Sequence, residues 1–391
     1  GEKSVMFPTR SQPFLIRRRT FLAGTAGLAL SACGPQLDDA GTPRRIARQV
    51  DQTLQSIART ELAADPELAT RLGLTEEQVG YDFNRYLTDR SQAAYERNRV
   101  SRLEILEALS KTPRPAEGSS QARHLDTVTA AYETAETLFV AGHGQTGLGI
   151  SYPYVMDHMR GAYIDVPDLL TRSHPFRKAP DAAAYVDRLA QFADALDDER
   201  RRMNADAQAG VLPPDFILVR MAGLATAFAG TPAASHVLVT TMESQLAGVE
   251  GLSSGDASAL LAKATGLVGD RIFPAYQRLA SDFHTLQKSA PSEPGVWQHP
   301  DGDAYYDASL AAYTDEGLTA EQLHALGLAE VDRLTADLQL ALFDAGLTEG
   351  SVTARLQMLA AQPGQVYPDT PEGRQALLDR MRAHPVQQGL A

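Results

Sequence analysis

Helical periodicity is the feature that most restricts what this chain can fold into. Apolar residues recur at intervals of three and four along nearly all of residues 44–391, and runs of alternating Val, Ile and Thr are almost absent. Because this spacing places apolar side chains on one face of a helix, the sequence predicts an all-α, multi-helix fold. The expected helices cover residues 44–64, 91–110, 121–141, 180–209, 214–229, 232–248, 256–288, 302–314, 319–345 and 371–383.

The strongest helix signal begins at Thr319. Thr319 and Gln322 form a capping box, in which the hydroxyl accepts an amide hydrogen and the Gln side chain reaches back. An apolar stripe follows at Leu323, Gly327, Val331, Leu334, Leu338 and Leu342. Pro- and Gly-rich loops are expected at 112–120, 142–153 and 289–303, the first as a hinge between an N-terminal helical hairpin and the main body.

The first 33 residues have the pattern of an export signal. A twin-arginine motif, which is a receptor-read address for export, comprises Arg18, Arg19, Phe21 and Leu22. The apolar stretch at 21–32 would span about 18 Å as a helix, well short of the ~30 Å hydrocarbon core. It therefore predicts a signal segment and not a membrane-spanning helix.

The export signal ends in a pattern typical of lipoproteins. This lipobox comprises Leu30, Ser31, Ala32 and Cys33. Its small residues admit the signal peptidase, and the Cys33 thiol takes a diacylglycerol before cleavage. The alternative interpretation is a cleaved secretory signal in which the cysteine occurs by chance. Gly34 stands where an inner-membrane retention signal would place Asp, which favours the outer membrane. The sequence thus predicts a signal at 1–33, a polar tether at 34–43 and a helical domain at 44–391, lipid-anchored in the periplasm or cell envelope.

The charge and the single cysteine exclude several classes of function. Lipid on Cys33 leaves no thiol for a disulfide, a zinc ligand or a nucleophile. The net charge of −13, which becomes more negative once the basic leader is removed, argues against nucleic acid as a partner. The membrane, reached through the lipid, is the partner that the sequence does predict.

The histidines provide no recognisable metal site. None of the nine forms His-Glu-x-x-His, and Glu321 with His324 supplies only half of a carboxylate–histidine motif. We therefore predict no metal ligands and no catalytic residues in this chain. Ser253 lies in a Gly-x-Ser-x-Gly pattern, but a helix-like segment precedes it, so it is expected to cap the next helix. The charged run at 197–203 predicts a solvated helix face.

Tyr305 and Tyr306 directly follow the Pro- and Gly-rich loop that ends at 303. Adjacent residues on a helix point in different directions, so one ring can face the core and the other a cleft. Packing of both rings in the core is the favoured interpretation.

Several stretches resemble one bacterial family. They are LAADPELATRLGL (62–74), residues 81–106, GVLPPDFILVRM (210–221) and DGDAYYDASLAAYTDEGLTAEQLHALGLAEVDRL (301–334). The last is the most specific, with its paired tyrosines, its Leu-Thr helix start and its His-x-Leu-Gly-Leu phrase. Across residues 45–383 the chain is similar to the family called domain of unknown function 885.

This resemblance implies a helical fold akin to the thermolysin-related zinc metallopeptidases, often exported and lipid-anchored. The family's His-Glu-x-x-Pro-Gly-His-His motif lies downstream of the 301–334 phrase and does not occur before Ala391. At the other end, five residues precede the first methionine, Met6. We therefore expect an inactive, cofactor-free N-terminal half of a peptide hydrolase that binds zinc only when full-length. The residues hypothesised to border its substrate cleft are Tyr305, Tyr306 and His324. The alternative is a complete, non-catalytic helical lipoprotein that binds a peptide or protein partner in the periplasm.

Overall fold

The computed structural model describes residues 43–139, 142–148, 150–314 and 317–387. The export signal, the lipobox and Cys33 lie outside these ranges. Helices make up 71% of the described residues, which confirms the all-α prediction. Within the same ranges, no helix is both long and apolar enough to cross a membrane.

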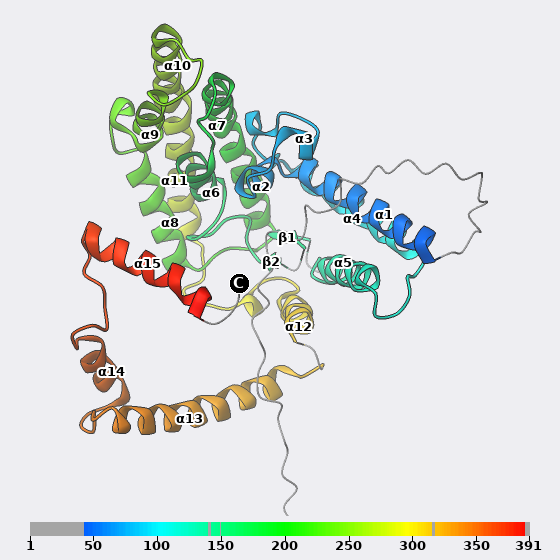
Figure 1. The fold of residues 1–391 in the computed structure, drawn as a ribbon, viewed down its shortest axis with the longest axis vertical. Helices are drawn as coiled ribbons and strands as arrows, with labels where there is room; N and C mark the ends of the chain where they lie inside the picture. The colour runs from blue at the N-terminus through cyan, green and yellow to red at the C-terminus, as the bar shows by residue number, and fades with distance from the viewer. Residues whose placement is uncertain (1–42, 140–141, 149, 315–316, 388–391) are drawn as a thin grey trace, which may run out of the picture.

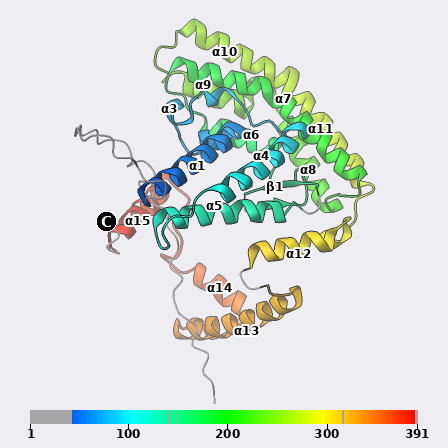
Figure 2. The same cartoon turned by 90° about the vertical axis from the view of Figure 1, so that its right-hand side faces the viewer.

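The largest hydrophobic core surrounds the long helix α7 (Ala179–Gln208). Figures 1 and 2 show α7 among the other helices of the main body. Helix α8 (Asp215–Phe228) packs along α11 (Phe273–Gln287), and both α11 and α10 (Ser254–Leu267) contact α7. Helix α9 (Val237–Leu246) packs against α10. The fully buried aromatic side chains of this core include Tyr185, Phe192, Tyr276 and Phe283.

The helix expected at 256–288 is continuous, but its middle turn is widened. π-Helical residues Val268–Ile272 join α10 to α11. Pro274 in the first turn of α11 has no amide hydrogen, and its ring excludes the regular bond to the carbonyl four residues earlier, which accounts for the wide turn. A second π-helical segment, Leu169–Ser173, follows α6 (Ala162–Asp168).

A smaller core joins α1 (Pro43–Ala64), α4 (Gln92–Lys111) and α5 (Ser120–Thr137). Its buried members are Val50, Ile57, Ile105, Leu109, Leu125 and Tyr132. Residues 112–120 connect α4 and α5, which pack against each other within this core. The expectation of a hinge there between two bodies is therefore wrong.

Short elements connect this unit to α7. They are α2 (Pro66–Arg71), α3 (Glu76–Val79) and the 3-10 turn Phe83–Arg85, which are too short to give a periodic signal in the sequence. Arg188 of α7 is fully buried beneath them. Its Nη2 donates to Thr70 Oγ1 at 2.6 Å and its Nε to the Tyr86 carbonyl at 3.0 Å. These bonds fix the chain that leads into residues 87–91 against α7.

The loop expected at 142–153 contains a small antiparallel hairpin, a correction of the sequence interpretation. Strands β1 (Gln145–Gly147) and β2 (Ile150–Tyr152) pair with Gln145 opposite Tyr152. Three-residue strands are too short for apolar alternation to show in the sequence. Gly144 has φ +68°, and a Cβ there would lie 2.2 Å from the Tyr152 carbonyl oxygen, so this position requires glycine.

Four helices follow the main body: α12 (Gly302–Tyr313), α13 (Ala320–Asp344), α14 (Val352–Ala360) and α15 (Pro371–Gln387). Helices α13 and α14 pack against each other and lie apart from the helices around α7 in both views (Figures 1 and 2).

Helix α13 has the expected N-terminus, because Thr319 and Gln322 form the capping box. Of its large apolar side chains, Leu342 is buried. Those that are exposed are Leu326, Leu328, Val331, Leu334, Leu340 and Phe343. The described residues therefore leave most of the apolar surface of this helix uncovered.

Candidate functional site

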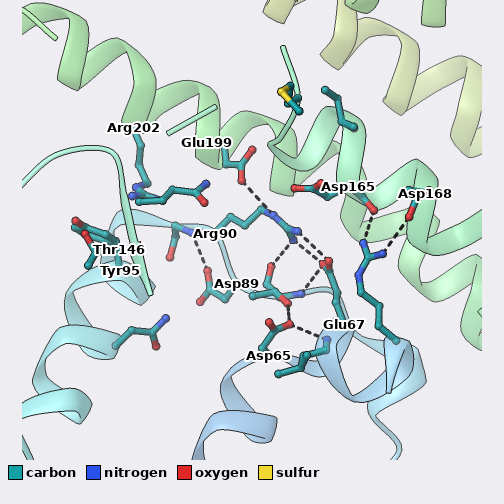
Figure 3. A pocket seen from close by; sticks show the side chains of 18 residues that line it. Asp65, Glu67, Asp89, Arg90, Tyr95, Thr146, Asp165, Asp168, Glu199 and Arg202 are labelled. Atoms are coloured by element: carbon teal, nitrogen blue, oxygen red, sulfur yellow. Dashed lines mark hydrogen bonds and ion pairs between the residues drawn. The ribbon is translucent and has the colours of Figure 1, made fainter. Parts of the chain in front are cut away.

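A cavity of about 610 Å³ lies where α2, α4, α6, α7 and the hairpin meet (Figure 3). Its charged lining residues are Asp65, Glu67, Arg71, Asp89, Arg90, Asp165, Asp168, Glu199 and Arg202. The lining thus carries six carboxyl groups and three guanidinium groups. A concave site in which polar groups converge is where a ligand is best sought.

Arg90 lies at the centre of this cavity (Figure 3). Its guanidinium makes a two-point ion pair with Glu67, with Nη1–Oε1 at 2.6 Å and Nη2–Oε2 at 2.9 Å. The Nε atom lies 3.2 Å from Glu199 Oε1. Two buried carboxylates therefore share one cation, and the fork geometry of the guanidinium holds them in fixed positions.

Glu199 comes from α7 and is 2% exposed. Its Oε2 accepts a hydrogen bond of 2.6 Å from the Ala162 amide at the start of α6. Burial raises the pKa of Glu199 to about 7, because the Arg90 charge and the Ala162 amide only partly offset the loss of water. This carboxyl group can therefore gain or lose a proton near neutral pH.

Glu67 comes from the first turn of α2, and its environment acts in the opposite direction. Burial alone would raise the pKa of Glu67, but the Arg90 charge and hydrogen bonds from Arg90 and Thr88 lower it below its ordinary value. Glu67 thus stays ionised and provides the permanent counter-charge to Arg90. Of the two buried glutamates, Glu199 is the one that can change its charge.

Two aspartates and one arginine form the rim beside α6. Burial raises the pKa of Asp165, whose Oδ2 accepts a 3.0 Å hydrogen bond from the Gly161 amide. Arg71 reaches across from α2, with Nη1 3.1 Å from Asp168 Oδ2 and Nη2 donating to the Asp165 carbonyl oxygen at 2.9 Å. Arg172 Nε lies 3.1 Å from Asp168 Oδ1, so two arginines neutralise Asp168, whereas Asp165 has no direct ion pair among the described contacts.

Asp65 and Asp89 hold the backbone on the other side of Arg90. Asp65 caps α2 by accepting from the Leu68 amide at 3.0 Å, and it also accepts from the Thr88 hydroxyl at 2.6 Å. Asp89 accepts from the Ser91 amide at 3.0 Å. These bonds explain why the extended segment between α2 and α4 presents Arg90 to the cavity.

Arg202 connects α7 to the hairpin. Its Nη2 donates to the Gly144 carbonyl at 2.8 Å, and its guanidinium lies 4.4 Å from the centre of the Tyr95 ring. Arg202 and Glu199 both come from the charged run at 197–203, which the sequence predicts to be a solvated face. That prediction is wrong for these two residues, which are 8% and 2% exposed.

The negative charge of the cavity exceeds its positive charge. Its six carboxyl groups face three guanidinium groups in the lining and two more beside it, Arg97 on Asp89 and Arg172 on Asp168. Asp65 and Asp165 have no direct ion pair among the described contacts, and burial raises the pKa of both Asp165 and Glu199. At both residues the largest cause is the loss of water, which the neighbouring arginines and amides only partly offset. The arrangement can therefore hold a cationic group, and it can exchange a proton through Glu199 when that group arrives.

The residues hypothesised to form a substrate cleft lie elsewhere. Tyr305 is 7% exposed, its hydroxyl bonds Ser151 Oγ at 3.2 Å and its ring stacks on His143. Tyr306 is 47% exposed, so packing of both rings in the core is wrong for this residue. His324 is exposed on α13. None of the three lines the Arg90 cavity, and their part in a cleft stays a hypothesis.

Two further sequence hypotheses can be compared with the structure. Ser253 caps α10 by accepting from the Asp256 amide at 3.1 Å, as predicted, and α9 rather than a strand precedes it. Among the described residues, no three His, Asp or Glu side chains gather as metal ligands. The zinc that the family resemblance implies therefore has no fitting ligand set in this part of the chain.

Comparison with known proteins places the fold. The chain matches a solved protein from Colwellia psychrerythraea, described as a "putative lipoprotein", with 23% sequence identity and a TM-score of 0.76. The match covers 88% of this chain and 58% of that one, so the chain spans less than two thirds of that protein. No curated protein matches. The model of the family described as "Bacterial protein of unknown function (DUF885)" matches residues 66–386, and the chain therefore belongs to this family.

Proposed function

We propose that this protein is an exported, lipid-anchored peptide-binding protein that holds a cationic group of its ligand in the Arg90 cavity. The export motif and Cys33 support the location, and the description of the solved relative as a "putative lipoprotein" is consistent with it. The sequence resemblance to metallopeptidase-like proteins supports peptide as the ligand class. The observation that carries the proposal is the pair of carboxyl groups at Asp165 and Glu199: Asp165 has no ion pair among the described contacts, and Glu199 shares Arg90 with Glu67.

A peptide ammonium group suits this cavity better than an anion does. An ammonium group donates three hydrogen bonds and carries a positive charge, for which Asp165 has no direct partner and which Glu199 obtains from an arginine that it shares with Glu67. Its arrival would favour the ionised form of Glu199, whose pKa is about 7 in the free protein. Binding should therefore release part of a proton to the solvent at pH 7.

Hydrolysis is not assigned to these residues. The cavity contains carboxyl, guanidinium, amide and hydroxyl groups, but the described part of the chain offers no zinc ligand set. We infer that this region holds peptide substrate for a peptidase of which it forms the helical half. A zinc-bound water in such an enzyme would be supplied by other residues.

The second candidate is a lipoprotein that binds a protein partner. The exposed apolar residues of α13 favour it, because large exposed apolar patches often mark interaction surfaces. A partner on that surface would slow amide hydrogen exchange within residues 320–344 and leave the Arg90 cavity unaffected.

The test of the first proposal is isothermal titration with lysyl-alanine amide and with its fully acetylated form at pH 7. We expect the free-amine probe to bind at least about tenfold more tightly, because charge-assisted hydrogen bonds contribute about 1.5–3 kcal/mol. The heat should vary with the ionisation enthalpy of the buffer, which reports proton release.

Three variants make the titration specific. Asp165→Asn should weaken binding, and Glu199→Gln should remove the buffer dependence of the heat. Asp194→Asn is the matched control, since this carboxylate lies on the same helix but its side chain is 69% exposed. Equal binding of the free and acetylated probes, or unchanged buffer dependence in Glu199→Gln, would contradict the proposal.

A further inference from the structure

A second cavity, of about 520 Å³, is lined by Tyr86, Leu87 and Asp89 of the segment that leads to Arg90. Its lining is mainly apolar and aromatic, and includes Ala63, Pro66, Tyr81, Tyr86, Leu87 and Ala94. Asp89 and Asn98 line both cavities, so the two are neighbours that share one polar wall.

The aromatic side chains of this second cavity differ in their contacts and exposure. The Tyr81 hydroxyl donates to the Leu62 carbonyl at 3.3 Å, and its ring meets the Phe83 ring edge-on at 6.3 Å. Tyr81 is thus held in place from two sides. The Tyr86 ring lies 6.2 Å from the Tyr81 ring and is 50% exposed, so it keeps apolar surface available for an incoming group.

The charge of the second cavity is balanced, in contrast to the first. Its charged side chains, Asp89 and Arg97, form an ion pair with 2.7 Å between Oδ2 and Nη2. Burial raises the pKa of Asp89 less than the hydrogen bonds from Ser91 and Arg97 lower it, so the carboxylate stays ionised beside its partner. An uncharged, apolar occupant therefore fits this cavity, and a second cation has no counter-charge there.

Asn98 supplies the connection between the two sites. It is exposed on α4 at the shared wall, and its amide can both donate to and accept from a peptide group. One peptide can place a cationic group on one side of this wall and an apolar side chain on the other. The peptide bond between them would then pass over Asn98.

We propose that the Tyr86 cavity is a second subsite, which takes an aromatic side chain of the same peptide whose cationic group occupies the Arg90 cavity. This inference rests on the proposed peptide-binding function and adds a preference to it. The ligand class is a peptide with a free ammonium group next to an aromatic residue. Burial of that side chain against Tyr86 would provide the additional affinity.

The experiment compares lysyl-phenylalanine amide with lysyl-alanine amide by isothermal titration on the wild-type chain. The phenylalanine peptide should bind about tenfold more tightly, the lower end of what burying such a side chain provides. In Tyr86→Ala the two peptides should bind equally, at the wild-type affinity for lysyl-alanine amide. Phe216→Ala is the control, since Phe216 is 49% exposed on α8 and lines neither cavity. Circular dichroism verifies the fold of both variants.

The possible failures are distinguishable. If both lysyl peptides fail to bind, the proposed function and the second subsite fall together. If both bind equally to the wild-type chain, the peptide-binding function stands and the subsite is refuted. The subsite is also refuted if the preference for phenylalanine survives in Tyr86→Ala or disappears in Phe216→Ala.

Discussion

Replacing Arg90 tests the electrostatic account of the cavity most directly. Arg90→Gln keeps a side chain of polar character but removes the cation that Glu67 and Glu199 share. The side chains of these two glutamates are 6% and 2% exposed, so water cannot replace the lost charge. Removing one partner of a buried ion pair typically costs about 3–5 kcal/mol, and we expect the free energy of unfolding to fall by this amount at pH 8.

The same variant should be less damaging in acid. The pKa of Glu199 rises from 4.5 in the unfolded chain to about 7 in the folded protein. Such a group stabilises the fold below pH 4.5, and this contribution is lost as the pH rises through 7. Without Arg90 the pKa of Glu199 rises further, so at pH 5.5 Glu199 is protonated and carries no uncompensated charge. The cost of Arg90→Gln should therefore be smaller at pH 5.5 than at pH 8.

Equilibrium urea denaturation followed by far-ultraviolet circular dichroism measures both quantities. The double variant Arg90→Gln/Glu199→Gln should recover part of the loss at pH 8, because the neutral amide removes one of the two unpaired charges. A loss below about 1 kcal/mol, or a loss that is the same at both pH values, would refute the reasoning. So would a double variant that is no more stable than Arg90→Gln alone.

Two further predictions concern other parts of the chain. Burial lowers the pKa of His174 to about 3, because the loss of water outweighs the bond to the Asp181 carbonyl, which raises the pKa. The neutral imidazole therefore stabilises the fold above pH 6.5, and this stability is lost as the pH falls from 6.5 toward 3. His174→Gln should reduce the acid slope of the unfolding free energy by up to about 1.4 kcal/mol per pH unit, and an unchanged slope in urea titrations would contradict this. Lipid on Cys33 should anchor the protein, so Cys33→Ser should release it from membranes or leave it unprocessed. Arg18→Lys with Arg19→Lys should block export. An identical soluble product from the wild type and Cys33→Ser would count against lipidation.

The sequence was sufficient to predict the long helices and several of their ends. Apolar periodicity and capping depend on residues within a few positions of each other, which is why the capping box at Thr319 and the cap at Ser253 are found as predicted. The elements that were missed are those with little local signal. They are the three-residue strands of the hairpin and the short helices at 66–71, 76–79, 162–168 and 352–360.

The candidate site could not be predicted in the same way. Arg90 pairs with Glu67 across 23 positions, and Glu199 comes from a different helix. A run such as Asp-Asp-Glu-Arg-Arg-Arg on a helix is usually solvated, and nothing within it shows that Glu199 and Arg202 face inward while their neighbours face water. Which face of α7 becomes buried is decided by the segments that pack on it.

The sequence by itself therefore determined the helical class of this protein and the ends of its longest helices, because each depends on neighbours along the chain; the export and lipidation motifs stay predictions from the same kind of local pattern. Only the tertiary structure decided the cavity around Arg90. There, α2, the segment that precedes α4, α6 and α7 bring six carboxyl groups and three guanidinium groups together. The proton affinity of Glu199 follows from the removal of water by that packing, and no local pattern contains this information.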